Sequence, residues 1–389
     1  MPPASRRDPP TTVRPRVTLA DVARYVGVSV SVVSRELNGD PALRARPETR
    51  RRIHAAAKTL GYAPNHAARS LRMSRAFAIG VIVPELTNAI YDGLIRGIED
   101  AADALGYQVL MGRTERIEPG ADFLHRLVGE GRVDGFLVQR KDETDFHDFA
   151  HLIEATAPVV LINSRGSRRG SVVLDDAAGA RVAAEHLLDL GHRDIALIGG
   201  DIHSHTGKAR ERGFLQAINA AGMRRRSAWI LHSGYSPEAG RLAVHQLCAT
   251  GGRRPTGIVV ANMNAAMGAL LGAREIGLRV PDQLSVVAIH DAWIADYAWP
   301  PLTTVRMPQY QLAQEAIRQL HLRLTGVRPQ DVTITEPPPV LVARESTTRP
   351  PRRLVRGRAA VQGADGGGTV GPDDEDLAAP EDGEDAPAS

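Results

Sequence analysis

The sequence predicts an all-α head followed by an α/β body whose two subdomains each contain a doubly wound parallel sheet. Three observations support this prediction. The chain has 389 residues, which is enough for two or three domains of ordinary size. Apolar residues recur at helical spacing in residues 17–62. From residue 77 onward, short apolar runs alternate with amphipathic segments, which is typical of β-then-α units.

Residues 17–62 are predicted to form three short helices, the first two joined as a helix-turn-helix. Thr18 is followed three positions later by an acid, which is the pattern of a helix N-cap, and a glycine then allows a sharp turn. Ser29 can cap a second helix that runs to about Leu37. The third helix is expected over 47–61, where a proline stands at the start and a glycine at the end.

The body is predicted to contain about nine strands, separated by helical segments that often end on a glycine. So many strands over roughly 270 residues favour two subdomains over one large sheet. The apolar runs expected to form strands are Phe77–Val83, Tyr107–Met111, Val133–Val138, Pro158–Ile162, Ser171–Leu174, Asp194–Ile198, Trp229–Leu231, Gly257–Ala261 and Leu284–Ile289.

Charge is distributed unevenly along the chain. Residues 1–75 carry 15 Arg and Lys against 5 Asp and Glu, whereas residues 76–350 carry 29 against 31 and residues 351–389 carry 4 against 9. A basic head on a near-neutral body is the pattern of a polyanion-binding module, although a solubilising arm is the simpler alternative. Residues 1–16 are expected to be a disordered arm, and residues 349–389 a disordered acidic tail.

Several function classes find no support in the sequence. The single cysteine, Cys248, can form neither an intramolecular disulfide nor a structural zinc site by itself, and it favours a reducing, cytoplasmic location. We expect no secretory signal and no membrane span. His203 and His205 lack a third ligand nearby, and Gly200–Ala209 departs from a phosphate-binding loop. We therefore expect no metal, no cofactor and no enzymatic activity.

Short motifs along the head and the body are typical of one protein family. These motifs are Val17–Ser29, Val33–Arg35, Leu37–Gly39, Pro47–Arg50, Leu60–Asn65, Ala68–Leu71, Ile79–Pro84, Val133–Gly135, Ala184–Leu187, Gly191-His192 and Pro300–Val305. Together they resemble the LacI/GalR family of transcriptional regulators over about residues 17–348, and the resemblance implies a periplasmic-binding-protein-like body. It divides the chain into a helix-turn-helix DNA-binding domain (17–63), a hinge helix (64–76), and an effector-binding and dimerisation domain with crossing strands (77–348).

The resemblance implies that the second helix lies in the major groove of double-stranded DNA. Arg35 is suited to a bidentate contact with guanine, and Val30 to an apolar contact with a thymine methyl. Leu71 matches a hinge leucine that wedges into the minor groove in the family. The candidate DNA-binding residues are Thr18, Ser29, Val30, Ser31, Ser34, Arg35, Asn38, Asn65 and Leu71.

The head also departs from the family pattern. Val32 stands where a hydroxyl residue is common, and Glu36 occupies a usually apolar position that we expect to lie close to the DNA. The segment between Asn38 and Thr49 is two residues longer than usual, and Arg46 replaces a common serine cap.

The body is expected to bind a small-molecule effector, a sugar or sugar derivative, outside the carboxyl ends of its strands. Arg210 would donate paired hydrogen bonds to ligand hydroxyls or to a carboxylate, and Tyr91 and Tyr235 would stack on an apolar face of the ligand. His290 stands where the family commonly has an acid, which suggests a ligand other than a plain hexose, such as one with negative charge. The candidate residues are Asn88, Tyr91, Gln139, Asn163, Thr206, Arg210, Tyr235, Asn262 and His290.

These features favour a transcriptional regulator, in the first instance a repressor, that binds a pseudo-palindromic operator as a homodimer and responds to its effector. A sugar-binding solute receptor would share the body fold, but it would carry a signal peptide and no basic head. An enzyme on an α/β scaffold would carry a nucleophile elbow, a phosphate loop or a metal cluster.

Overall fold

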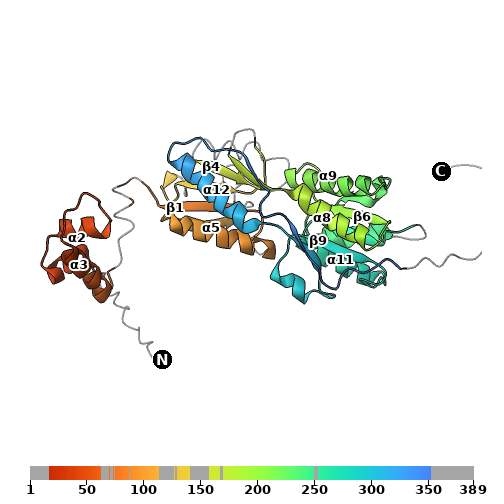
Figure 1. Ribbon diagram of the computed structural model, residues 1–389, viewed down its shortest axis with the longest axis horizontal. Coiled ribbons are helices and arrows are strands. Elements are labelled where there is room, and N and C mark those ends of the chain that lie inside the picture. The colour runs from red at the N-terminus through yellow and green to blue at the C-terminus, as the bar shows by residue number, and fades with distance from the viewer. Residues whose placement is uncertain are drawn as a thin grey trace, which may run out of the picture. The chain divides into compact units, whose positions relative to one another are not determined.

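A computed structural model describes residues 17–62, 70, 73, 75–86, 88–113, 127, 129–140, 157–166, 170–248 and 253–351 (Figure 1). The expected arm, most of the expected hinge helix with Asn65 and Leu71, and the acidic tail beyond residue 351 lie outside these residues. Within the described part of the chain, no helix combines the length and the apolar character that crossing a membrane requires.

The head consists of three helices, as predicted: α1 (Leu19–Val26), α2 (Val30–Leu37) and α3 (Pro47–Leu60). Thr18 caps α1 in a capping box with Asp21, and Ser29 caps α2. Gly27 adopts the left-handed conformation at the end of α1, with φ of 76°, which only glycine adopts without strain. The three helices bury one small core, formed by Val22, Ala23, Val26, Val33, Ile53, Ala56 and Ala57.

The first sheet of the body contains β1 (Ala78–Val83), β2 (Gln108–Arg113), β3 (Gly135–Val138), β4 (Val159–Ile162), β5 (Ser171–Leu174) and β11 (Val332–Ile334). Its strand order is β11-β5-β4-β3-β1-β2, and all neighbouring strands run parallel. Helix α5 (Asp92–Ala104), which follows the 3-10 turn η1 (Ala89–Tyr91), packs against α12 (Gln309–Leu324) beside this sheet (Figure 1).

The second sheet contains β6 (Ile195–Gly199), β7 (Ile230–His232), β8 (Gly257–Val260), β9 (Ser285–Ile289), β10 (Thr303–Arg306) and β12 (Val340–Val342). Its strand order is β12-β10-β9-β8-β6-β7, and it is parallel except for the β10–β12 pair at its edge. Its helices are α8 (Asp176–Asp189), α9 (His205–Ala220), α10 (Pro237–Cys248) and α11 (Met263–Glu275), with the 3-10 turns η4 (Ser227–Trp229) and η5 (Trp293–Tyr297).

The chain passes between the two sheets three times, because β5 is followed by β6, β10 by β11, and β11 by β12. Each of the nine predicted apolar runs becomes a strand, with ends that differ by at most two residues from those predicted. Strands β10, β11 and β12 were not predicted, and the antiparallel β10–β12 pair departs from the all-parallel expectation. The crossings bring the carboxyl ends of both sets of parallel strands to one region of the body.

Candidate functional site

The exposed side of α2 presents most of the side chains that the sequence singled out in the head. Val30 is 45% exposed, Ser31 and Arg35 are exposed, and Ser34 is half-buried. An exposed valine beside serines and an arginine, at the start of a capped helix, suits contact with a partner surface that offers both apolar groups and hydrogen-bond acceptors.

Arg35 is held by an acid from the loop that follows α2. Its Nε donates a 2.7 Å hydrogen bond to Oδ2 of Asp40, while Oδ1 of Asp40 accepts from the backbone nitrogen of Ala42 at 2.8 Å. The hydrogen bond from Arg35 lowers the pKa of Asp40, so this carboxylate stays ionised at neutral pH. Asp40 therefore fixes the direction in which the guanidinium points.

The remaining polar candidates in the head serve the helix ends. The Thr18 hydroxyl donates to Oδ2 of Asp21 at 2.7 Å and accepts from the Asp21 backbone nitrogen. Ser29 accepts from the Val32 nitrogen, and Asn38 donates to the carbonyl oxygen of Ser34. Thr18 and Ser29 thus shape the N-terminal ends of α1 and α2, where backbone N–H groups can bind anions, whereas Asn38 shapes the C-terminal end of α2.

Glu36 does not lie on the exposed side of α2, contrary to the expectation that it would lie close to the DNA. It is 8% exposed and faces α3, where its two oxygens lie 3.5 Å from Nε of Arg50 and 3.3 Å from Nε2 of His54. An acid is tolerated at this apolar position because two α3 side chains pair with it.

A cavity of about 600 Å³ lies where the carboxyl ends of the two sheets meet. All nine candidate residues of the body line it, four after strands of the first sheet or in η1, and five from the second subdomain. Other polar residues that line it, which the sequence analysis did not name as candidates, are Glu85, Arg113, Arg140, Asp201, Ser233, Ser236 and Gln309.

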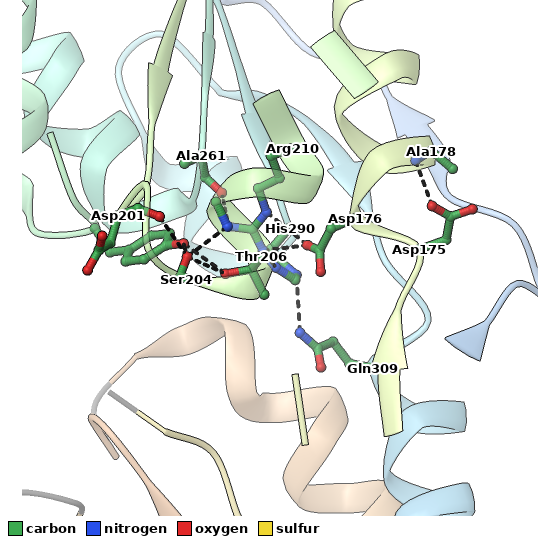
Figure 2. A network of polar contacts seen from close by, with 12 residues as sticks. Asp175, Asp176, Ala178, Asp201, Ser204, Thr206, Arg210, Ala261, His290 and Gln309 are labelled. Carbon is green, nitrogen blue, oxygen red and sulfur yellow. Dashed lines mark hydrogen bonds and ion pairs between the residues drawn. The ribbon is translucent and has the colours of Figure 1, made fainter. Parts of the chain in front are cut away.

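Arg210 is the centre of a buried polar network in the wall of this cavity (Figure 2). Its Nε and Nη2 both donate to Oδ1 of Asp176, at 2.8 and 2.7 Å, and Nη1 donates to the carbonyl oxygen of Ala261 at 2.7 Å. Nη2 also lies 2.9 Å from Nε2 of His290. The expectation that Arg210 forks onto a ligand differs from this arrangement, because the guanidinium already forks onto Asp176.

His290 is neutral in this network. Its complete burial, followed by the positive charge of Arg210, holds the pKa of the imidazole well below its usual value. Because Nε2 accepts from Arg210, the ring proton belongs on Nδ1, which lies 3.1 Å from the Gln309 amide. In the structure Nε2 of Gln309 faces this Nδ1, and the buried Oε1 has no partner among the described residues. A ring proton on Nδ1 requires the reverse amide orientation, in which the carbonyl oxygen accepts from Nδ1.

Two lining residues have the same unusual backbone conformation. Asn163 follows β4 with φ of 48°, and His290 follows β9 with φ of 69°. The left-handed region is costly for residues other than glycine, and such strain is concentrated at binding sites. The buried Oδ1 of Asn163 has no hydrogen-bond partner among the described residues, so it is placed to accept from a bound molecule.

The Tyr235 hydroxyl closes another part of the wall. It lies 2.8 Å from Oγ1 of Thr206 and 3.2 Å from Oγ of Ser204, so these hydroxyls hold the ring in place. A Cβ at Gly200 would lie 2.1 Å from the ring, so the absence of a side chain there allows the ring's position. Among the described residues, no group of three or more His, Cys, Asp or Glu is arranged to hold a metal ion.

Comparisons with known proteins decide the family. A family model described as bacterial regulatory proteins, lacI family, matches residues 18–65, and a periplasmic binding protein-like domain matches residues 184–347. The HTH-type transcriptional repressor PurR of Erwinia tasmaniensis is 33% identical over 343 residues, which are 87% of this chain and 99% of that protein. The chain belongs to the LacI family.

This LacI-family regulator also resembles other members in sequence and structure. The catabolite control protein A of Priestia megaterium is 31% identical over 85% of the chain and 99% of its own length. A LacI family transcriptional regulator from Mycobacterium smegmatis superposes with a TM-score of 0.65 and 40% identity, over 70% of this chain and 99% of that one. The structure of the lac repressor dimer bound to operator and the anti-inducer ONPF superposes with a TM-score of 0.67 and 29% identity, over 86% of this chain and 100% of that one. The chain is thus a DNA-binding transcriptional regulator with an effector-binding body.

Proposed function

We propose that this LacI-family regulator is a repressor that binds a pseudo-palindromic double-stranded DNA operator as a homodimer and releases or tightens on it when a sugar or sugar derivative binds. The observation that best supports this proposal is the combination of two features in one chain. The head presents the exposed Arg35 on the capped helix α2, and the body has a cavity of about 600 Å³ between its two sheets. Three relatives support parts of the proposal. PurR of Erwinia tasmaniensis is named as a transcriptional repressor, the lac repressor structure is a dimer bound to operator, and a third structure is the complex of the transcriptional regulator CelR with cellobiose.

In this proposal α2 lies in the major groove. Arg35 contacts guanine, Val30 contacts a thymine methyl, and Ser31 and Ser34 donate to bases or phosphates. The N–H groups at the starts of α1 and α2, shaped by Thr18 and Ser29, hold phosphates. The roles of Asn38, Asn65 and Leu71 remain part of the proposal, the last as a minor-groove wedge.

Two copies of the chain are proposed to pair partly through an aromatic patch, defined as Trp293, Tyr297 and Trp299. These side chains are 64%, 79% and 89% exposed, and the Trp293 and Tyr297 rings meet edge to face with centroids 6.0 Å apart. Large aromatics are costly to leave in water and are enriched at protein interfaces. A second copy is the occupant that the operator-bound dimer of the lac repressor favours.

Effector binding is proposed to change how the two subdomains close on the cavity, and so to alter operator affinity. The coupling free energy expected for such a link is about 1–3 kcal/mol, of either sign. The solute-receptor alternative is not favoured, because residues 18–65 match the regulatory-protein model. The relatives compared are named as regulators, which supports a non-enzymatic, cytoplasmic role.

A DNA titration tests this function. An operator is first selected from a random duplex pool with the full chain, and fluorescence anisotropy then measures binding by the wild type and Arg35→Ala. Loss of a bidentate guanine contact is expected to cost about 1–3 kcal/mol on the operator and little on a scrambled duplex. Lys58→Ala, at the end of α3, removes the same charge as a control. Equal affinity and selectivity for Arg35→Ala would refute the assignment of α2.

A further inference from the structure

The buried cation in the wall of the cavity has its own buried counter-ion. We propose that Asp176 makes this cavity selective for an uncharged ligand, because it neutralises Arg210 and so denies the guanidinium to anions. The inference rests on the proposed function, since it concerns the effector of the same cavity. It differs from the negatively charged ligand that the presence of His290 suggested.

The geometry of the pair supports a neutralised wall. The Arg210 and Asp176 side chains are 5% and 1% exposed, and two guanidinium N–H groups meet the same carboxylate oxygen. Inside a protein, opposite charges this close interact strongly, and each one compensates the burial of the other. Oδ1 of Asp176 accepts both of these hydrogen bonds, whereas its buried Oδ2 has no partner among the described residues, so the negative charge of the carboxylate stays beside the guanidinium.

An anion that approached Arg210 would meet two obstacles. It would have to displace or share contacts that Asp176, the Ala261 carbonyl and His290 already make. It would also bring a second negative charge next to the buried Asp176, and two like charges this close disfavour the ionisation of both groups. The neutral His290 adds no positive charge that would offset this cost.

The rest of the lining suits an uncharged ligand with hydroxyl or amide groups. The other charged lining residues are two of each sign, Arg113 and Arg140 against Glu85 and Asp201. Carboxamides provide uncharged donors and acceptors on both sides of the cavity, from Asn88, Gln139, Asn163, Asn262 and Gln309. A polyhydroxylated or amide-bearing molecule can satisfy these groups without bringing a charge.

The inference is tested with Asp176→Asn, which keeps the shape and one acceptor oxygen but leaves Arg210 uncompensated. Thermal unfolding of the full chain is followed in inorganic phosphate and in sodium chloride of equal ionic strength. Phosphate is expected to raise the Tm of the variant relative to wild type by about 3 °C once it is about tenfold above its Kd. The double variant Asp176→Asn/Arg210→Gln should lose this gain. Equal responses of wild type and Asp176→Asn overturn the inference.

A second measurement does not depend on the stability of a variant. The wild-type protein is screened by thermal shift with matched pairs, D-glucose with D-glucose 6-phosphate, and D-ribose with D-ribose 5-phosphate. If an anionic member stabilises the protein more than its uncharged partner, the inference is wrong, whereas the reverse order supports it. If the two members of each pair shift the Tm equally, the comparison of wild type and Asp176→Asn in inorganic phosphate decides. Operator binding, measured in parallel, shows separately whether the proposed function holds.

Discussion

Arg210 and His290 lie 80 positions apart in the sequence, yet Nη2 of the first and Nε2 of the second are 2.9 Å apart. A single donor thus sets the protonation of the imidazole, and the imidazole in turn sets the orientation of the Gln309 amide. Because Gln309 is the first residue of α12, beside the first sheet, and His290 follows a strand of the second sheet, this chain of contacts links the two subdomains.

The stability of the body is expected to fall as the pH drops below about 6.5. Burial lowers the pKa of His186, His192, His205 and His290, so each stays neutral in the folded state while the unfolded chain binds a proton. The contribution of such a histidine to the free energy of unfolding is fully present at a pH above its pKa in the unfolded chain. It is lost as the pH falls toward the lower pKa of the folded state. The slope approaches about 1.4 kcal/mol per pH unit for each histidine.

Urea unfolding at pH 7.5 and pH 5.5 measures this effect. His192→Gln is the variant of choice, because the imidazole is 1% exposed and its nitrogens lie 2.9 Å from the Thr256 hydroxyl and 2.8 Å from the Thr348 carbonyl oxygen. The variant is expected to be less stable at pH 7.5 but to lose less stability on acidification. A pH dependence as steep as that of the wild type would contradict the assignment of His192.

Asp40 is expected to be a positioning residue for DNA recognition. Asp40→Asn keeps the oxygen that caps Ala42 but removes the charge that anchors Nε of Arg35. Discrimination between the operator and a duplex with its contacted guanine replaced should fall about 3- to 10-fold, within the range of a weakened bidentate contact. Affinity for non-specific DNA should rise, because a negative charge near the phosphates is lost.

The exposed Glu48 at the start of α3 provides the control for Asp40. Glu48→Gln removes the same charge from the head and should raise non-specific affinity without reducing discrimination. Anisotropy titrations at two salt concentrations separate the two effects. If Asp40→Asn discriminates bases as well as the wild type does, the ion pair does not orient Arg35.

The contact between α5 and α12 leaves no room for a methyl group at one position. A Cβ at Gly97 would lie 2.6 Å from the Tyr310 carbonyl oxygen and 2.7 Å from Cβ of Ala313, whereas a Cβ at Gly93 would make an ordinary contact of 3.4 Å with Gln309. Gly97→Ala is therefore expected to destabilise the protein by about 1–3 kcal/mol. Gly93→Ala on the same helix should be neutral or stabilising by up to about 1 kcal/mol. Urea midpoints compare the two, and equal effects would contradict this packing.

The sequence predicted those parts of the fold that depend on local signals. Helices α1, α2 and α3 have caps and terminal glycines that can be recognised one by one, and the nine predicted strands are continuous apolar runs. Strands β11 and β12 have three residues each and flank a run of prolines, so they carry no periodic pattern. Their formation depends on pairing with β5 and β10, which are distant in the sequence.

The candidate cavity also has features that local sequence signals predicted and features that depend on tertiary packing. The rule that ligands bind beyond the carboxyl ends of strands placed all nine body residues around one cavity. It did not identify Asp176 or Gln309, because both begin helices and meet Arg210 and His290 only through tertiary packing. The sequence likewise did not show that Glu36 faces α3, because its partners Arg50 and His54 lie on another helix.

The aromatic patch is expected to stabilise the homodimer. Trp299→Ser removes the most exposed of its rings, and truncation of a central aromatic at an interface commonly costs about 2 kcal/mol or more. The dimer dissociation constant should therefore rise about 30-fold, as measured by sedimentation velocity over a dilution series. Val327→Ser, which removes an exposed apolar side chain just after α12, is the matched control and should leave dissociation unchanged. A Trp299→Ser protein that dimerises like the control would place the interface away from the aromatic patch, because the loss of its most exposed ring would then have cost the dimer nothing.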